Sequence, residues 1–470
     1  MSPFRGTDVV LTRLAAMRLA LELALARAAG RLSRLAGRGG GTTLPGKLLT
    51  TIDPGAVSAL ARRLPLGTAI VSATNGKTTT ASLVAGILSP RVQLAHNSSG
   101  ANLVSGVTST LLDSRGAELG LFEVDEGAFP DLALRLRPRA VCLGNLFRDQ
   151  LDRYGELEQI AERWRIAARA LPEGSTLVLN ADDPQVGDLA DEHAASVTFG
   201  LDDPAQARHS LQHAADSKYC LRCGKPYAYA AAYVGHLGDY RCPSCGHARP
   251  PLELAARAVQ LEGLDGASFD LVTPEGTRRI QLALPGLYNV YNALAAAALA
   301  RALGASLDEI ETGLAGAGPA FGRFERIDAG DRRLLLLLIK NPAGANEVIR
   351  TLVAGEPPKL ALIALNDGIA DGRDVSWIWD VDFEPLLEGL GRVVLSGERA
   401  AELALRCKYA GMPEGSLEVV PDLEQALDRG LALAGVGGEL VVLPTYTAML
   451  ALRRIVARRG HVRQYWERAA

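Results

Sequence analysis

Short apolar runs alternate with longer amphipathic stretches over the first half of the chain, and each run ends in polar residues. Four of these runs predict strands: residues 68–73 (TAIVSA), 119–124 (LGLFEV), 140–146 (AVCLGNL) and 175–183 (STLVLNADD). Strands that alternate with helices form a parallel sheet covered on both faces. Ligands of such sheets bind at the carboxyl ends of the strands, which is where these polar residues fall.

A second α/β pattern follows in the last third of the chain. Its strand candidates are residues 333–339 (RLLLLLI), 359–366 (KLALIALN), 392–397 (RVVLSG) and 438–446 (GELVVLPTY). Between the two patterns, residues 284–304 predict a turn and a long alanine-rich helix. We therefore predict an α/β protein with a central, mostly parallel sheet over residues 51–322 and a further α/β domain over residues 323–470.

The N-terminal pattern is amphipathic with a basic face. Charged side chains interrupt residues 9–37 every three to five positions: Arg13, Arg18, Glu22, Arg27, Arg31 and Arg34. These interruptions exclude a secretory signal and a membrane span. We predict a helical segment over residues 1–50 that either docks on the protein's own core or makes reversible contact with an anionic membrane. Without an export signal we expect a cytoplasmic protein, with the inner face of the plasma membrane as the alternative place.

Composition narrows the class of protein. The chain has 470 residues, of which 48% are hydrophobic and 22% charged, a profile typical of a globular protein of about three domains. Its net charge is −3 and its pI about 6.2, so there is no electrostatic case for nucleic acid as a partner.

A phosphate-binding loop is predicted between the first strand and the helix that follows it. The residues of this loop are Thr74, Asn75, Gly76, Lys77, Thr78 and Thr79. A loop at a helix N-terminus directs backbone N–H groups at phosphate, the lysine reaches the β- and γ-phosphates, and Thr78 places its hydroxyl on Mg²⁺. One departure is Val71, which stands where a standard P-loop has its first glycine.

Four cysteines form two C-x-x-C pairs separated by 18 residues: Cys220, Cys223, Cys242 and Cys245. This spacing is typical of a zinc ribbon, in which four thiolates surround Zn²⁺ and leave no position for a substrate. We therefore predict a structural zinc site in a module inserted at residues 216–250. The five basic residues of this module are expected to form a solvated face, with phosphate contact as the alternative.

The string T-N-G-K-T-T of the loop resembles the Mur ligase family, which includes the muramyl peptide ligases and folylpolyglutamate synthase. Further matches follow in order: Glu123 in F-E-V-D-E, residues 145–155 (NLFRDQLDRYG), Asn180 in L-N-A-D-D-P, Asn289, Asn292 and Arg323. The resemblance implies a Mur central domain with a P-loop and a Rossmann-like C-terminal domain. It also implies that Glu123 binds Mg²⁺ and that the loop, the three asparagines and Arg323 bind ATP.

Two departures from the Mur pattern restrict the expected chemistry. The family's metal-binding histidine is Gln150 here, and residues 151–175 contain no lysine that could be carbamylated to hold a second Mg²⁺. One Mg²⁺ is therefore the safer expectation. Only about seventy residues precede the loop, too few for the domain that binds UDP-sugars in muramyl ligases. This argues against a UDP-linked substrate.

The C-terminal domain resembles one group within this family, the ligase-like subunits of lipid II isoglutaminyl synthase. The resemblance rests on residues 340–344 (KNPAG) and on residues 366–380 (NDGIADGRDVSWIWD). It implies ATP-dependent amidation of the D-glutamate α-carboxylate of lipid II through an acyl phosphate. Ammonia would come from a GatD-like glutaminase subunit, and Asp374 would complete that partner's Cys–His pair; the alternative role of Asp374 is to cap a helix.

Three other hypotheses remain open from the residues. The first is an amino-acid ligase of the muramyl or folylpolyglutamate type. The second is a zinc-ribbon P-loop protein that binds nucleic acid, against which the net acidity speaks. The third is a regulatory protein without catalysis, suggested by Val71, Ala73 and Gln150, although Lys77, Thr78 and Glu123 are all retained.

Overall fold

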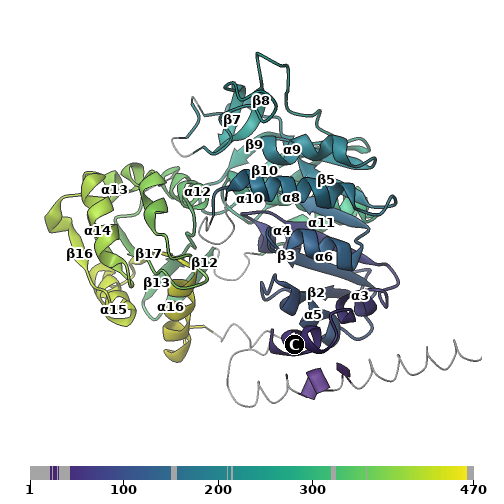
Figure 1. Cartoon of the computed structure of the whole chain (residues 1–470). Helices are drawn as coiled ribbons and strands as arrows, with labels where there is room; N and C mark the ends of the chain where they lie inside the picture. Colours follow the sequence, from purple (N-terminus) through teal and green to yellow (C-terminus); the bar gives the residue numbers. More distant parts are fainter. Residues whose placement is uncertain are drawn as a thin grey trace, which may run out of the picture.

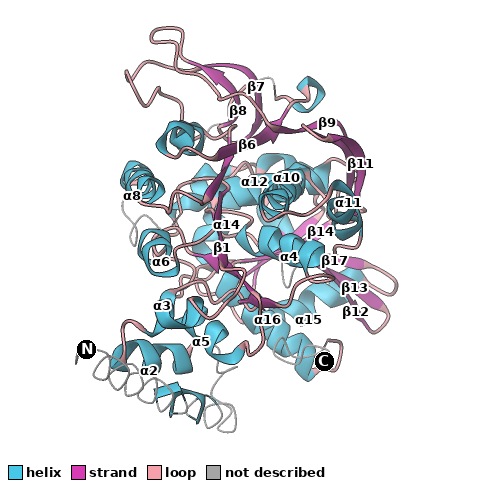
Figure 2. Cartoon of the chain, turned by 90° about the vertical axis from the view of Figure 1, so that its right-hand side faces the viewer, coloured by secondary structure: helices cyan, strands magenta, loops and turns pink. Residues whose placement is uncertain are grey.

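The computed structural model describes residues 22–23, 25–28, 30, 43–149, 156–208, 210–212, 215–318, 324–355 and 357–462. Two sheets, each covered by helices, lie side by side, and a small two-stranded hairpin sits against the larger one (Figures 1 and 2). The α/β class and the Mur-type arrangement predicted from the sequence are confirmed.

The central sheet has nine strands in the order β11-β10-β9-β6-β5-β4-β1-β3-β2. Their bounds are β1 Thr68–Ser72, β2 Leu94–His96, β3 Leu119–Val124, β4 Ala140–Leu143, β5 Thr176–Asn180, β6 Ser196–Leu201, β9 Leu254–Leu261, β10 Ala267–Thr273 and β11 Gly276–Leu282. Strands β1 to β6 and β9 pair in parallel, whereas β10 and β11 extend the sheet as an antiparallel edge that the sequence did not predict.

Helices cover both faces of this sheet, because the strands direct apolar side chains to each face. One face packs on α4 (Lys77–Leu88), α10 (Leu287–Ala302) and α11 (Leu307–Ala315). The other face packs on α3 (Ala56–Ala61), α5 (Val104–Asp113), α6 (Phe129–Leu136) and α8 (Leu157–Arg169). Helix α10 is buried on nearly all sides, which explains why alanine replaces larger residues along it: small side chains let it lie close to the sheet.

The C-terminal sheet has the order β12-β13-β17-β14-β15-β16 and is parallel except for β12. The strands are β12 Glu325–Ala329, β13 Arg332–Leu336, β14 Leu360–Ala364, β15 Arg392–Ser396, β16 Leu417–Val419 and β17 Glu439–Pro444. The covering helices are α12 (Pro342–Val353), α13 (Glu384–Gly389) and α14 (Ala400–Tyr409) on one face, and α15 (Leu423–Ala434) and α16 (Tyr446–Arg458) on the other. All eight strands predicted in the two halves of the chain are present.

The remaining short elements are α2 (Leu44–Ile52), α9 (Pro184–Gly187), the 3₁₀ turns at Asp188–Glu192, Pro204–Gln206, Ser376–Asp380 and Glu414–Ser416, and the antiparallel hairpin of β7 (Ala228–Val234) and β8 (Leu237–Arg241).

Part of the N-terminal segment packs on the central domain. Leu23 and Ala26 are buried in the same cluster as α3 and α5, and the guanidinium of Arg27 donates to the carbonyl of Leu112 at 2.8 Å. For these residues the docked alternative holds. Most of the predicted helix lies outside the described residues, and among the described residues no helix combines the length and the apolarity needed to cross a membrane.

Candidate active site

The phosphate loop is held in shape by two asparagine side chains, one in the loop after β4 and one on α10. Asn145, which follows β4, accepts from the backbone N–H of Asn75 at 2.9 Å and donates to its carbonyl at 3.1 Å. Gly76 has a φ of +86°, and a Cβ there would lie 2.0 Å from Oδ1 of Asn292. Only glycine tolerates both this conformation and this close approach. The loop therefore enters α4 in one fixed geometry.

Lys77 and Glu126 form a buried ion pair at the start of α4. The Lys77 Nζ lies 2.8 Å from Oε2 of Glu126, and it also donates to the carbonyls of Ala73 and Thr74. Burial alone would lower the pKa of Lys77, but the charges of Glu126 and its acidic neighbours outweigh it, so the pKa is raised. The same pairing lowers the pKa of Glu126 against its own burial. Both groups are therefore charged at neutral pH.

Glu123 lies at the carboxyl end of β3, beside the loop. Its backbone N–H donates to the Asn97 side chain at 2.9 Å, and its carboxylate accepts from Asn102 at 3.4 Å. The residue is 3% exposed, and its charge acts on Lys77. A buried carboxylate with a hydroxyl donor on the neighbouring helix turn, here Thr78, is an oxygen donor set that suits Mg²⁺. Glu123 and Thr78 thus fit the ion expected from the sequence.

Three further predicted asparagines gather at the loop. Asn292 on α10 donates to Asn289 at 3.0 Å and accepts from Thr80 at 3.4 Å, while Asn289 donates to the carbonyl of Pro285 at 2.7 Å. Asn180, at the end of β5, lines a small pocket together with Asn75 and Asn292. Asn75 and Asn292 are 217 positions apart in the sequence, and the parallel strands together with α10 bring them to one edge of the sheet.

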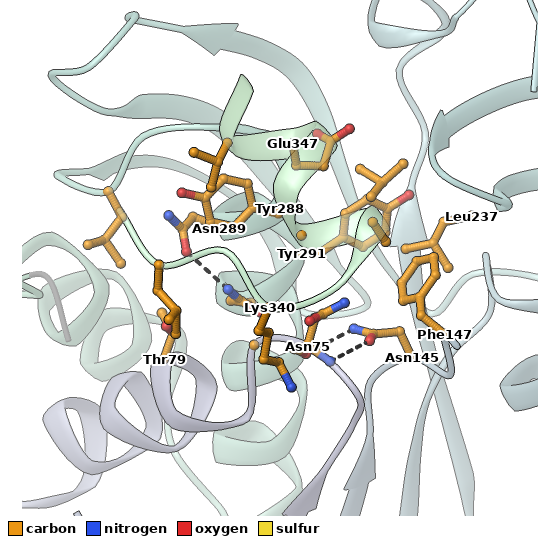
Figure 3. A pocket seen from close by; sticks show the side chains of 18 of the residues that line it. Asn75, Thr79, Asn145, Phe147, Leu237, Tyr288, Asn289, Tyr291, Lys340 and Glu347 are labelled. Carbon is orange, nitrogen blue, oxygen red and sulfur yellow. Dashed lines mark hydrogen bonds between the residues drawn. The ribbon is translucent and has the colours of Figure 1, made fainter. Parts of the chain in front are cut away.

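A pocket of about 110 Å³ opens from the loop toward the C-terminal domain (Figure 3). Its polar lining residues include Asn75, Gly76, Thr79, Asn145, Asn289, Asn292, Lys340 and Glu347, and its apolar and aromatic lining residues include Phe147, Val234, Leu237, Leu284, Tyr288, Tyr291, Phe324 and Leu338. A cavity that combines a phosphate-binding loop with aromatic walls has the chemistry of a nucleotide site.

The C-terminal domain closes this pocket through the start of α12. Lys340 donates from Nζ to Asp149 at 2.6 Å and to the carbonyl of Thr74 at 3.1 Å. Asn341 caps α12 through the N–H of Gly344 and pairs its amide with Asn75, donating to it at 2.9 Å. No role for Lys340 was predicted from the sequence. The structure places its ammonium group against the phosphate loop.

The four cysteines predicted as ligands come together at the base of the β7–β8 hairpin. Their Sγ atoms all lie within 4.8 Å of one another, with 3.5 Å between Cys220 and Cys245 and between Cys223 and Cys242. Four sulfurs held at zinc's usual 2.3 Å would lie about 3.8 Å apart, whereas a disulfide needs about 2.05 Å. The cluster can therefore hold a metal ion in a closed tetrahedral site.

The solvated basic face predicted for this module is wrong for Arg249. Its guanidinium is largely buried and lies 3.0 Å from the Asp182 carboxylate of the central domain. His247, which the sequence analysis did not consider, bridges Tyr227 at 2.7 Å and Asp188 at 3.0 Å beside Cys220. The sequence feature that could have indicated its role is its position two residues after Cys245, the last of the four cysteines.

Asp374 lies apart from the pocket, on the surface of the C-terminal domain. Its exposed carboxylate accepts from the N–H of Ser376 at 2.9 Å at the start of a 3₁₀ turn, and this hydrogen bond lowers its pKa. Asp374 thus stabilises the chain just before the turn, whose N-cap is Val375, and the exposed carboxylate remains accessible to another chain. Arg323 and Gln150 lie outside the described residues.

The two cysteines outside the cluster are poor nucleophiles. Cys142 in β4 and Cys407 in α14 are buried, and burial raises the pKa of each thiol to about 12. Since the thiolate is the reactive form, neither side chain is suited to hydrolysing glutamine.

Comparison with known proteins agrees with this geometry. The family model for the Mur ligase middle domain matches residues 71–236, and that for the MurT ligase C-terminal domain matches residues 338–449. The chain is 34% identical to the lipid II isoglutaminyl synthase (glutamine-hydrolyzing) subunit MurT of Streptococcus pneumoniae, over 94% of this chain and 99% of that protein. It is 32% identical to the same subunit of Staphylococcus aureus, over 92% and 96%.

Solved structures share the fold at lower identity. A pseudomurein peptide ligase type C from Methanothermus fervidus superimposes with a TM-score of 0.68 at 21% identity, covering 85% of this chain and 80% of the other. Folylpolyglutamate synthase from Mycobacterium tuberculosis superimposes with a TM-score of 0.60 at 16% identity, covering 87% and 96%.

Fold and site together define a Mur-type ATP-dependent ligase. Within that class, the full-length similarity is to one kind of subunit, and the chain belongs to the MurT family.

Proposed function

We propose that the chain is the synthetase subunit of a lipid II isoglutaminyl synthase and amidates the D-glutamate α-carboxylate of lipid II in peptidoglycan synthesis. The observation that carries the proposal is the full-length similarity to MurT subunits of that enzyme, together with a phosphate loop that borders the pocket and carries the buried Lys77 near Glu123. The reaction is formation of a C–N bond at the expense of ATP.

The reaction would proceed in two balanced steps. A carboxylate oxygen of the substrate attacks the γ-phosphorus of ATP, ADP leaves, and an acyl phosphate forms. The nitrogen of ammonia then attacks the acyl carbon, phosphate leaves, and the nitrogen loses a proton to give the amide. The first step brings two anions together, so cations must offset their repulsion. Mg²⁺, when bound, would screen the phosphate charges.

The residues of the loop are suited to these demands. Gly76, Thr78 and Thr79 surround the phosphates with backbone N–H groups and hydroxyls, while Thr74 and Asn75 fix the shape of the loop through Asn145. Lys77 supplies a positive charge that is already fixed in place. Thr78 and Glu123 hold Mg²⁺. Asn180, Asn289, Asn292 and Arg323 complete the ATP site. Lys340 brings a second ammonium from the other domain to the same loop.

The ammonia is proposed to come from a GatD-like glutaminase subunit, because the thiols of Cys142 and Cys407 are buried. Asp374 is proposed to orient the catalytic histidine of that partner. An ionised, exposed aspartate can do so across an interface, by holding the imidazole and stabilising its protonated form. Its low pKa keeps it ionised at neutral pH.

Two further proposals concern the metal and the membrane. The metal of the four-cysteine cluster is proposed to be a structural Zn²⁺, which thiolate ligands in closed tetrahedral geometry favour. Because the proposed substrate carries a lipid tail, the protein would work at the inner face of the plasma membrane.

Mass spectrometry of lipid II tests the proposal. Lipid II is incubated with the chain, ATP, Mg²⁺ and either ammonium or glutamine plus a GatD-like subunit. The expected result is a loss of about one mass unit per stem peptide, as OH becomes NH₂, with glutamine effective only when the partner is present. An unchanged mass in both conditions, with ATP consumed when a free amino acid is added, would support the amino-acid ligase alternative instead.

A further inference from the structure

The cysteine module, residues 216–250, connects the four-cysteine cluster to the pocket. The cysteine pairs occupy the open end of the β7–β8 hairpin, and Cys242 follows directly on β8. The turn of the hairpin lies at the opposite end, five residues along the strand from Cys242, or roughly 17 Å at the usual rise per residue. At that turn, Val234 and Leu237 line the pocket that begins at the phosphate loop.

The turn is packed firmly against both neighbouring parts of the protein. The ring of His236 lies 4.6 Å from the ring of Phe147, another lining residue, and Gly235 donates to Gln212 at 2.8 Å. On the other side, Arg350 of α12 donates to the carbonyl of Tyr233 at 3.0 Å. The hairpin therefore forms a wall shared between the central sheet and the C-terminal domain.

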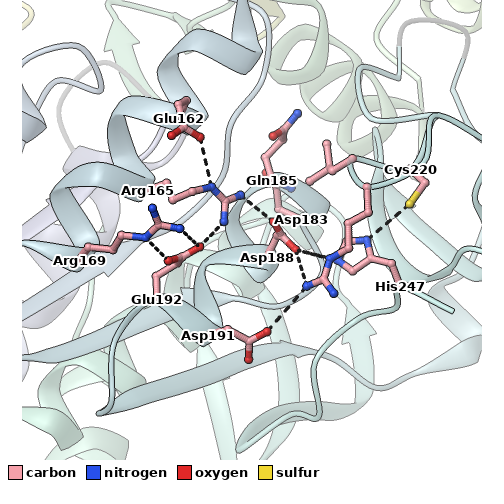
Figure 4. A network of polar contacts seen from close by, with 12 residues as sticks. Glu162, Arg165, Arg169, Asp183, Gln185, Asp188, Asp191, Glu192, Cys220 and His247 are labelled. Carbon is pink, nitrogen blue, oxygen red and sulfur yellow. Dashed lines mark hydrogen bonds and ion pairs between the residues drawn. The ribbon is translucent and has the colours of Figure 1, made fainter. Parts of the chain in front are cut away.

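The base of the module is fixed on the acidic segment that follows Asn180. His247 and Arg222 both contact Asp188 at 3.0 Å, and Arg165 of α8 contacts it from the other side (Figure 4). The contacts of the module extend along this segment, because the strand residue Gly238 donates to the carbonyl of Asp182 at 2.9 Å.

Asp182 connects the cysteine module to helix α10, which borders the pocket. Its buried carboxylate accepts from Arg249 at 3.0 Å and from the hydroxyl of Tyr291 at 2.6 Å. Tyr291 lines the pocket on α10, directly before Asn292. Two routes thus lead from the cluster to the pocket: along the hairpin to Leu237, and through Arg249 and Asp182 to Tyr291.

We propose that the cysteine module forms the wall for the base of the bound nucleotide, and that metal binding at the cluster therefore strengthens nucleotide binding. The inference rests on the proposed ATP site. Val234 and Leu237 are apolar side chains in the pocket lining, and apolar side chains pack on a base rather than on phosphates, which assigns them to the base. Without metal, the cysteine pairs lose the ion that joins them, and the strand that carries Leu237 loses its anchor.

Coupling of this kind is reciprocal: if metal raises nucleotide affinity by some factor, nucleotide raises metal affinity by the same factor. The full chain is compared loaded with Zn²⁺ and stripped by a chelator, with circular dichroism to check folding. Calorimetry measures binding of a non-hydrolysable ATP analogue and of inorganic tripolyphosphate. We expect stripping to weaken the analogue about tenfold or more with little change for tripolyphosphate. We also expect saturating analogue to raise Zn²⁺ affinity by the same factor.

If the protein unfolds when its metal is removed, a variant of the Zn²⁺-loaded chain provides the test instead. Leu237→Ala in the Zn²⁺-loaded chain should weaken the ATP analogue severalfold while leaving tripolyphosphate affinity and zinc content unchanged. Arg241→Ala, on the same strand with an exposed side chain, is the matched control and should bind both ligands normally. The inference is overturned, and the proposed ATP site is not, if the ATP analogue binds the Zn²⁺-loaded and the folded metal-free protein equally well. The same holds if it binds Leu237→Ala as tightly as the wild type. A loaded wild type that binds neither ligand overturns the proposed ATP site.

Discussion

The ammonium of Lys77 lies 2.8 Å from the carboxylate of Glu126, and both side chains are at least 94% buried. The loop lysine is thus already paired before any phosphate arrives. A phosphate group can replace the carboxylate as its counter-charge. The ion pair with Glu126 therefore keeps the Lys77 ammonium buried and oriented in the absence of nucleotide.

Glu126→Gln should lower the free energy of unfolding of the nucleotide-free protein by about 3–5 kcal/mol, because it leaves the buried Lys77 charge without its partner. ATP supplies that partner, so it should raise the melting temperature of the variant more than that of the wild type. Thermal unfolding with and without ATP measures both effects. Glu158→Gln, on the exposed face of α8, is the control. Equal stabilisation of variant and wild type by ATP would contradict the role of the pair.

Gly76→Ala should weaken ATP binding at least tenfold, because its Cβ would displace Asn292 from the loop. Gly100→Ala is a matched control. Gly100 also has a positive φ, +76°, but a Cβ there meets nothing within 4 Å. Its cost should be limited to backbone strain of about 1–2 kcal/mol in stability. Calorimetric ATP affinities and denaturation curves of the two variants separate strain from steric displacement; equal ATP affinities would show that the contact with Asn292 is unimportant.

Lys340→Gln should slow ammonium-dependent amidation by at least tenfold, or about 1.4 kcal/mol, because it removes the cation that the C-terminal domain brings to the loop. If Lys340 faces the terminal phosphate, ATP affinity falls more than ADP affinity. Lys359→Gln, an exposed lysine of the same domain, should leave both affinities unchanged. An equal loss for ATP and ADP would indicate only a tether between the domains.

Asp374→Asn should abolish glutamine-dependent amidation in the complex with a glutaminase while leaving the ammonium-dependent reaction intact. Asp422→Asn is a close control, since Asp422 is also exposed and accepts from a backbone N–H at 2.9 Å at a helix start. Rates with glutamine and with ammonium are compared for both variants. Undiminished glutamine use by the Asp374 variant would exclude its role in the partner's active site.

The buried pair of His236 and Asp183 predicts a pH dependence of stability. Their side chains lie 3.4 Å apart and are fully buried; burial lowers the pKa of His236, but the charge of Asp183 outweighs it and raises the pKa. The stabilisation is therefore complete below the ordinary histidine value of about 6.5 and is lost as pH rises through the raised pKa. Urea unfolding from pH 6 to 9 should show this decline in the wild type and a flatter profile in His236→Gln.

Much of the fold followed from local pattern. The strands ending before Thr74, at Glu123 and at Asn180 were predicted because buried parallel strands are continuously apolar and their ends are polar. The strands β9 to β11 were not, since residues such as Arg278 and Arg279 in β11 interrupt any clear period. The cysteine spacing predicted the cluster without the structure.

The residues of the site were predictable only where they belong to a motif shared with a known family. Lys77 and Glu123 belong to such motifs. Glu126 and Lys340 lie inside the F-E-V-D-E and KNPAG matches, but their roles, like that of Arg249, could not be predicted because they arise from contacts with residues 49, 266 and 67 positions away. Contacts of that span depend on how sheets and helices pack, which no local pattern encodes. For the same reason, the part of the cysteine module that faces the pocket could not be distinguished from a solvated insertion.

The paired amides of Asn75 and Asn341 have a consequence for turnover. One belongs to the phosphate loop and the other to the cap of α12, so they bind the two domains together beside the pocket. Separation of the domains at this place has to break these contacts and that of Lys340 with Thr74. If product leaves between the domains, its release rate is expected to depend on how fast the domains separate and on solvent viscosity.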